Sequence, residues 1–175
     1  MLKLRTAVAA DFNAILALNE ESVAALSPLD LERLSRLHAQ AARHCVVVDD
    51  AAVVAFVLAL RESADYDSPN FQWFVARYDH FLYVDRIVVS ANARARGAGT
   101  LLYRDLFDFA AASSVDLITC EYDLDPPNLR SQRFHARFGF AEVGRQRLTG
   151  SGKQVSLQAA QVPLQTPQVN LCPNE

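Results

Sequence analysis

Cysteine is scarce in this chain, and its spacing excludes two kinds of small cross-linked protein. The three cysteines, Cys45, Cys120 and Cys172, are odd in number and form no Cys-x-x-Cys pair. A disulfide framework or a zinc site needs paired or closely spaced cysteines. Cys45 and Cys120 fall in apolar runs typical of strands, so we expect them to be buried free thiols and expect no metal.

Long apolar runs are also missing. A membrane-spanning helix needs about 18 or more apolar residues in succession, and the longest candidate, residues 46–60, is interrupted by Asp49 and Asp50. Residues 1–5 lead into an amphipathic pattern and carry no apolar core of a signal peptide. We therefore expect a cytoplasmic protein that does not enter a membrane.

The chain has no excess of positive charge, because 17 Lys and Arg stand against 20 Asp and Glu, a formal net charge of −3. Proteins that bind nucleic acid present a basic surface to the phosphates, so the composition argues against that partner. The arginines concentrate in residues 94–104 and 130–147, which indicates local sites for anions.

The residues present suit one domain of mixed α/β class. A chain of 175 residues, of which 51% are hydrophobic, can form one full core. The predicted strands are residues 2–6, 45–48, 53–60, 83–89, 116–122, 142–148 and 154–162. The predicted helices are one ending near residue 25, one from a cap at Ser27 through Pro28 to Ala41, one ending near residue 114, and one from Asn128 to Gly139. The domain would span residues 1–162, and the proline-containing residues 163–175 would form a loose tail.

Residues 63–80 show no clean period and contain the only Trp of the chain. Aromatic residues mixed with Asp in an irregular connection are typical either of a substrate-binding wall or of a loop whose rings pack on the core. The candidates for substrate contact are Tyr66, Phe71 and Trp73.

Residues 83–102 combine a β-branched strand, a glycine loop and the start of an amphipathic helix. Such a loop directs main-chain N–H groups at the positive end of a helix dipole toward one anion. A dinucleotide fingerprint would need a small residue where Leu102 stands, and a Walker loop would need a lysine between Gly99 and Thr100. The loop alone therefore predicts a phosphate site of another kind, or an ordinary tight turn.

The spacing of Arg94, Gly97 and Gly99 resembles the (Gln/Arg)-x-x-Gly-x-(Gly/Ala) signature of the GNAT acetyltransferases. Two further matches occur in the family's order. Asn128 followed by residues 134–140, Phe-His-Ala-Arg-Phe-Gly-Phe, resembles its second signature, and the opening from Arg5 resembles its usual N-terminus. The resemblance covers residues 2–162 and implies a mixed, mostly antiparallel sheet of about seven strands flanked by about four helices.

The resemblance implies that acetyl-CoA binds where strand 83–89 diverges from strand 117–122 beyond a bulge. The pantetheine arm would pair with the main chain of Ile87, Val88 and Val89. The pyrophosphate would lie on Arg94, Ala95, Arg96, Gly97, Ala98, Gly99 and Thr100. Asn128 and Ser131 would contact the pantetheine or a phosphate.

The chemistry implied is attack of a primary amine on the thioester, which needs a deprotonated amine, a donor to the oxyanion and an acid for the thiolate. A main-chain N–H near Val89 would serve the oxyanion. In the resemblance, His135 stands where the family usually has the Tyr that acts as general acid. His135 is therefore either that acid or a residue that only packs between helix and sheet. Asp85 and Glu121 are alternative bases, unless either forms a buried ion pair with Arg86 or water serves instead.

The leading hypothesis is thus an acetyl-CoA-dependent N-acetyltransferase acting on a primary amine of a small molecule or peptide. The alternative is a GNAT-like module that binds acyl-CoA without turnover, because His135 replaces the usual Tyr. Transfer to oxygen, or of a longer acyl chain, is a weaker third hypothesis. The resemblance also admits a homodimer through the last strands or the tail.

Overall fold

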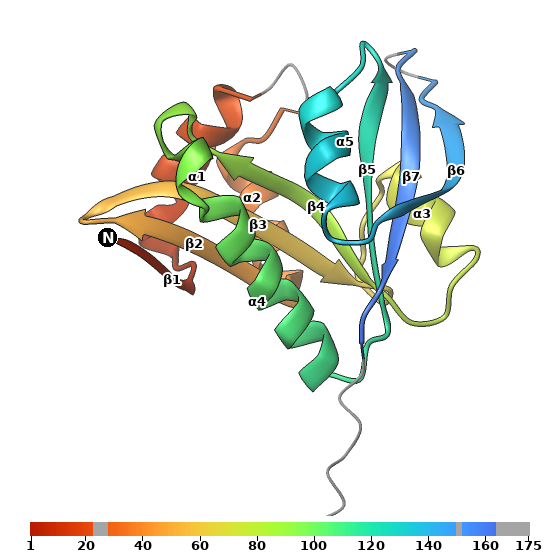
Figure 1. Cartoon of the computed structure of the whole chain (residues 1–175), viewed down its shortest axis with the longest axis horizontal. Helices are drawn as coiled ribbons and strands as arrows, with labels where there is room; N and C mark the ends of the chain where they lie inside the picture. Colours follow the sequence, from red (N-terminus) through yellow and green to blue (C-terminus); the bar gives the residue numbers. More distant parts are fainter. Residues whose placement is uncertain (23–27, 150–151, 164–175) are drawn as a thin grey trace, which may run out of the picture.

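The fold is built on a single mixed β-sheet (Figure 1). The computed structural model describes residues 1–22, 28–149 and 152–163, and within these residues seven strands lie in the order β1-β2-β3-β4-β5-β7-β6. The strands are β1 (Leu2–Thr6), β2 (Arg43–Asp49), β3 (Ala52–Arg61), β4 (Leu82–Val89), β5 (Leu117–Asp125), β6 (Ala141–Arg147) and β7 (Gln154–Gln161). The helices are α1 (Phe12–Glu20), α2 (Leu31–Gln40), α3 (Pro69–Val75), α4 (Ala98–Ala112) and α5 (Leu129–Ala136).

Neighbouring strands pair antiparallel except β4 and β5, which run parallel. The mixed, mostly antiparallel sheet confirms the predicted fold class. One face packs on an apolar cluster to which α1, α2 and α3 contribute, and the other on a cluster built with α4 and α5. In α4 the apolar positions Leu102, Leu106 and Ala110 recur at helical spacing and are buried, as the sequence predicts.

The two parallel strands pair over a very short distance. Only Leu82 with Ile118 and Tyr83 with Thr119 are partners between β4 and β5 in the described residues. Beyond them the strands diverge (Figure 1), while β4 stays paired with β3 to Val89 and β5 stays paired with β7. We call the diverging part, beyond Tyr83 and Thr119, the β4–β5 fork.

Three local predictions are corrected. Residues 69–75, expected in an irregular connection, form the helix α3, which begins with Pro69 at its first turn. The cap of α2 is Asp30, whose side chain accepts a hydrogen bond from the Arg33 N–H at 2.7 Å; the predicted cap, Ser27, lies outside the described residues. The helix α1 ends at Glu20, earlier than predicted.

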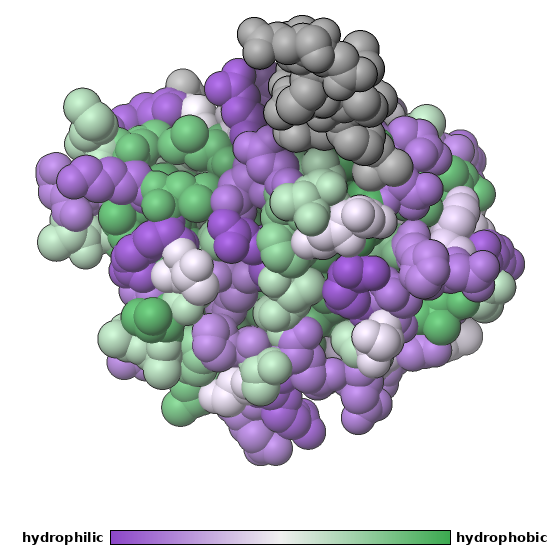
Figure 2. All heavy atoms as spheres, turned by 90° about the horizontal axis from the view of Figure 1, so that it is seen from below, coloured by the Kyte–Doolittle hydropathy of each residue, from purple (hydrophilic) through white to green (hydrophobic). Residues whose placement is uncertain are grey.

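Other expectations concern burial and surface. Cys45 and Cys120 are buried free thiols, as predicted. Over the described ranges, none of the helices has the length and apolarity required to cross a membrane. Figure 2 shows polar and apolar residues intermixed over the face seen there.

Candidate active site

A bulge in β4 brings two charged side chains to the same face of the sheet. Asp85 is an extra residue opposite residues 58–59 of β3. One carboxylate oxygen of Asp85 accepts from Arg86 Nε at 2.6 Å, and the other accepts from the Tyr66 hydroxyl at 2.5 Å. The two charged side chains are only 4% and 1% exposed. Asp85 thus forms the buried ion pair weighed as its alternative role, which leaves it poorly suited to act as the base.

Glu121 occupies the start of the fork and is partnered on one oxygen. It lies two residues beyond Thr119, the last β5 residue paired with β4. Its Oε1 accepts from Asn70 Nδ2 and from the Tyr83 hydroxyl, each at 2.9 Å. Its Oε2 is buried and has no hydrogen-bond partner among the residues that the structure describes.

Burial, opposed by the hydrogen bonds from Tyr83 and Asn70, raises the pKa of Glu121 from 4.5 to about 8. A carboxyl group with such a pKa can take up a proton near neutral pH and release it again. Of the two carboxylates predicted from the sequence, Glu121 therefore has the geometry and basicity of a general base.

The hydrogen bonds to Glu121 involve residues that the sequence did not single out. Asn70 lies on α3, and its Oδ1 accepts from Gln146 Nε2 of β6 at 3.1 Å. Tyr83 has no exposed surface. Ser68 followed by Pro69 is a sequence signal for a helix start, but nothing local connects Asn70 with β5 or β6.

The main chain of β4 turns toward the fork at alternate residues. The Ser90 N–H donates to the Val54 carbonyl of β3, and in an antiparallel pair successive residues point alternately toward and away from the partner. Ile87 and Val89 therefore turn their N–H and C=O groups away from β3, toward the fork. Val88 directs its groups to β3, which disfavours the predicted pairing of its main chain with a coenzyme.

The glycine loop ends in a helix N-terminus, as predicted. Gly97 has φ +86°, a left-handed conformation that favours glycine, and α4 begins at Ala98. The N–H groups of Ala98, Gly99 and Thr100 belong to the first turn and have no partner within the helix. This N-terminus can hold a phosphate group.

The two predicted arginines point in different directions. Arg94 Nε donates to the Val89 carbonyl at 3.1 Å, beside the fork. Arg96 forms an ion pair with Asp49 at the end of β2, at 2.5 Å. Arg96 is therefore partly neutralised, and the support for phosphate binding is stronger for Arg94. The side chain of Ala95 lies outside the part that the structure describes.

Helix α5 closes the same side of the sheet. Asn128 caps the helix, as predicted, with its Oδ1 accepting from the Ser131 N–H at 3.1 Å. A methyl group on Gly99 would lie 3.2 Å from the Phe134 ring. The closeness of Gly99 to Phe134 shows that α5 and the glycine loop are in contact.

His135 is turned inward and is 3% exposed. Its Nδ1 lies 2.7 Å from the Ser131 carbonyl, which can only accept, so Nδ1 carries the proton. Nε2 then accepts from the Tyr103 hydroxyl at 2.6 Å. Burial lowers the pKa of His135, so the neutral ring has no N–H left for a thiolate. The geometry agrees with the packing role weighed for His135 and not with the acid.

The predicted substrate aromatics fall in three different environments. Phe71 is completely buried and packs on Tyr66 and Tyr83, so it supports a wall from behind and does not line it. Trp73 is half-buried, with the Arg77 guanidinium 3.9 Å from its ring centroid. Tyr66 lines a pocket of about 210 Å³.

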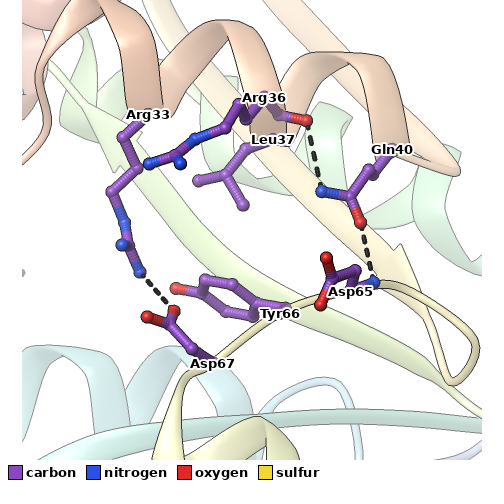
Figure 3. Close-up of a pocket in the computed structure, with 7 residues that line it drawn as sticks. All are labelled: Arg33, Arg36, Leu37, Gln40, Asp65, Tyr66 and Asp67. Atoms are coloured by element: carbon purple, nitrogen blue, oxygen red, sulfur yellow. Dashed lines mark hydrogen bonds and ion pairs between the residues drawn. The ribbon is translucent and has the colours of Figure 1, made fainter.

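The pocket beside Tyr66 lies between α2 and the β3–α3 connection (Figure 3). Arg33 Nη2 binds Asp67 at 3.1 Å across it. Arg36 reaches Glu32 only at 3.8 Å, and both of these side chains are largely exposed. The pocket is thus lined by charges of both signs and is joined to Asp85 through the Tyr66 hydroxyl.

The described residues contain no group of three or more His, Cys, Asp or Glu side chains arranged to hold a metal ion. The forked parallel pair, the helix N-terminus beside it and the carboxylate at its start are the arrangement implied for acetyl-CoA-dependent acetyltransferases. The sequence model of the protein family described as acetyltransferase (GNAT) family matches residues 11–140 of this chain. The chain belongs to this family, as predicted from its motifs.

Known proteins similar to this chain agree with that assignment. Phosphinothricin N-acetyltransferase of Streptomyces coelicolor is 45% identical over 64 residues, which are 37% of this chain and 36% of that protein. The chain therefore matches only about a third of the length of this curated relative.

Two solved structures share the fold over nearly the whole chain. The ribosomal-protein-S18-alanine N-acetyltransferase from Escherichia coli is 14% identical, with a TM-score of 0.71 over 97% of this chain and 99% of that chain. The putative acetyltransferase yncA from Salmonella typhimurium, solved with its cofactor acetyl-CoA, is 16% identical, with a TM-score of 0.69 over 98% and 99%.

Proposed function

We propose that the chain transfers the acetyl group of acetyl-CoA directly to a primary amine, with Glu121 as the general base. The observation that carries the proposal is the buried Glu121 Oε2, which has no partner among the described residues and lies at the start of the β4–β5 fork. Family membership supports acetyl-CoA as the donor.

The coenzyme would bind along the fork. The main-chain groups of Ile87 and Val89 would pair with the pantetheine arm, as an added strand would. The pyrophosphate would lie on the N–H groups at the start of α4, with Arg94 beside it. Asn128 and Ser131, in the first turn of α5, would approach the coenzyme from the other side.

The reaction would proceed through a tetrahedral intermediate. Glu121 Oε2 takes a proton from the charged amine, and the nitrogen then attacks the thioester carbon. The carbonyl electron pair moves to oxygen, which a main-chain N–H of β4 near Val89 stabilises. As the oxyanion re-forms the carbonyl and the C–S bond breaks, the second proton of the nitrogen passes to the sulfur, which yields the amide and the free thiol. In this scheme His135 holds α5 on α4 and transfers no proton.

The acceptor would carry a negative group besides its amine. This part of the proposal rests on the pocket beside Tyr66. There Arg36 is only loosely paired with Glu32, and Arg33 could exchange its exposed partner Asp67 for an anionic group of the acceptor. Phosphinothricin, an amino acid that carries a phosphinate, is the first probe because of the relative that acetylates it. Peptides with a free N-terminus are the second class to be tried.

The experiment measures thiol release from acetyl-CoA with phosphinothricin, putrescine and an alanyl peptide, together with acetyl-CoA binding by calorimetry. We expect release with the anionic amine and much less with putrescine. Arg36→Gln should raise KM for phosphinothricin, whereas Lys3→Gln, the same charge change on β1, should leave it unchanged. Equal rates with all amines would contradict the acceptor class.

The second candidate is a module that binds acyl-CoA without turnover, and it is favoured by the inward orientation of His135. Tight acetyl-CoA binding without thiol release from any acceptor would support the module. Absence of binding would refute both functions.

We also propose a cytoplasmic location and a homodimer, which rest on the sequence. Light scattering after gel filtration tests the dimer: a mass of one chain, 19.4 kDa, would contradict it.

A further inference from the structure

A chain of two side-chain amides ends on Glu121. Asn70, 6% exposed, donates from Nδ2 to Glu121 Oε1 at 2.9 Å. Gln146 donates from Nε2 to Asn70 Oδ1 at 3.1 Å. The three residues come from α3, β5 and β6, so the chain connects elements that are far apart in sequence.

The polarity of this chain is fixed by its members. The ionised form of Glu121 can only accept hydrogen bonds, so in that state Asn70 must present its NH₂ group to Glu121. The amide of Asn70 could rotate by half a turn and present its oxygen instead, which would repel a carboxylate. With Gln146 as it stands, this rotation would bring two NH₂ groups together, so both amides would have to rotate at once.

An apolar contact fixes α3 against the same strand. A methyl group on Gly144 of β6 would lie 2.5 Å from Trp73 Cζ2 and 2.9 Å from Cη2. Such distances are well below van der Waals contact, so the Trp73 ring lies directly on the glycine backbone. The contact thereby holds α3, and with it Asn70 three residues earlier, against β6.

We propose that Asn70 and Gln146 are positioning residues, which hold Glu121 in one rotamer with Oε1 bound and Oε2 free for the amine proton. The inference rests on the proposed role of Glu121 as the base. According to this inference, β6 contributes to the pKa of Glu121, because its residues Gln146 and Gly144 hold Asn70 and α3 in place.

The surroundings of Glu121 allow this role to be measured separately. The titratable groups that act on it are Tyr83 and Asp85 of β4 and Asp123 of β5. Both aspartates are paired with a cation, and the residue opposite on β7 is the apolar Leu157. A change at Asn70 leaves these groups in place, so a shift in the titration of Glu121 reports the loss of the amide.

The experiment is a pH titration of the intact protein labelled with ¹³C in the Glu carboxyl groups, followed by NMR. The Glu121 signal is assigned by its loss in Glu121→Gln. Asn70→Ala removes a donor to the charged form, so the midpoint should rise by about one pH unit. Asn13→Ala, which removes an exposed amide on α1, should leave the midpoint unchanged.

Two variants of Gln146 test the polarity. Gln146→Glu can accept from Asn70 Nδ2 and so favours the rotated amide, whereas Gln146→Met keeps the length without polarity. The upward shift of the Glu121 midpoint should be larger for Gln146→Glu than for Gln146→Met. The added negative charge of Gln146→Glu raises the midpoint by itself, so the decisive result is an upward shift in the uncharged variant Gln146→Met.

Gly144→Ala tests the link through Trp73. The added methyl group should displace α3 and raise the Glu121 midpoint, and Gly144→Ala/Trp73→Phe should restore it because the smaller ring lacks the clashing atoms. These variants, with those of Gln146, decide the question even if Asn70→Ala does not fold.

Thiol-release kinetics then distinguish this inference from the proposed function. If the wild type transfers acetyl groups, the rising limb of its pH profile, where the base loses its proton, should move with the NMR midpoint in each variant. Unchanged midpoints in Asn70→Ala, Gln146→Met and Gly144→Ala would overturn the inference even with an active enzyme. Shifted midpoints without acetyl transfer in the wild type would support the network and refute the proposed function.

Discussion

The stability of Glu121→Gln relative to the wild type should increase as the pH rises. The Glu121 carboxyl has a pKa of about 8 in the folded protein and an ordinary value of 4.5. Folding above pH 4.5 therefore requires that the ionised side chain of the unfolded chain take up a proton. A group with a raised pKa in the folded state loses its contribution to stability as the pH rises from 4.5 to 8.

The size of the effect follows from the two pKa values. At pH 7 the cost is about 3 kcal/mol, and at pH 5 it is about 1 kcal/mol. Glutamine can still accept from Tyr83 and Asn70, but it places an NH₂ group where Oε2 has no partner among the described residues, which costs about 1–3 kcal/mol independently of pH. The difference in stability between Glu121→Gln and the wild type should thus grow by about 2 kcal/mol from pH 5 to pH 7.

The assay is urea unfolding followed by circular dichroism, for the wild type and the variant at several pH values between 5 and 8. Glu142→Gln is a matched control. Its hydrogen bond with Ser156 lowers the pKa of Glu142, so both states are ionised in this range and the difference should stay constant. A difference for Glu121→Gln that is also constant with pH would refute the argument that Glu121 is protonated in the folded protein.

Three further predictions concern other parts of the fold. Gly97→Ala should weaken acetyl-CoA binding, measured by calorimetry, and cost about 1 kcal/mol of stability, because its φ of +86° strains any side chain. Arg86→Met should cost about 3–5 kcal/mol in urea unfolding, because it leaves Asp85 buried without its cation. His44→Gln should reduce the loss of stability at acid pH, because burial and the neighbouring His38 lower the pKa of His44 from 6.5 to about 4. Between pH 6.5 and pH 4 the free energy of unfolding of the wild type should therefore fall by about 3 kcal/mol more than that of the variant.

Each of these predictions has a control on the same chain. Gly152→Ala carries a comparable backbone strain, at φ +70° on the β6–β7 turn, and should not affect acetyl-CoA binding. Equal weakening by both glycine variants would contradict the phosphate site. Asp85→Asn/Arg86→Met should recover part of the stability lost in Arg86→Met. Parallel pH curves for wild type and His44→Gln would show that His44 titrates normally.

The strand, loop and helices of the proposed coenzyme side were largely predictable because their signals are local. The alternation of apolar residues in β4, the glycine at Gly97 and the helical pattern of α4 follow one another along the chain, and so do Asn128 and its helix. Each of these features is fixed by interactions within a few residues. Their spacing therefore carried the family assignment.

The acceptor side was less predictable because its contacts join distant segments. In the sequence, Asp85 and Glu121 look equivalent, because both are acidic residues in apolar strands. Only the bulge in β4, which pairs Asp85 with Arg86, distinguishes them. Asn70 lies in a helix too short to show a period, and its partners are on β5 and β6. The orientation of His135 depends on Tyr103 of α4, with which no pattern in its own helix connects it.

The most direct test of the central claim is the pH profile of acetyl transfer by the wild type and Glu121→Gln. The measurement is the initial rate of thiol release from saturating acetyl-CoA, with the best acceptor of the panel, between pH 6 and pH 9. The wild-type rate should rise with a midpoint near 8, and Glu121→Gln should lose about 10²–10⁴-fold in kcat with unchanged coenzyme affinity. A variant that keeps both the rate and the pH profile of the wild type would contradict Glu121 as the base.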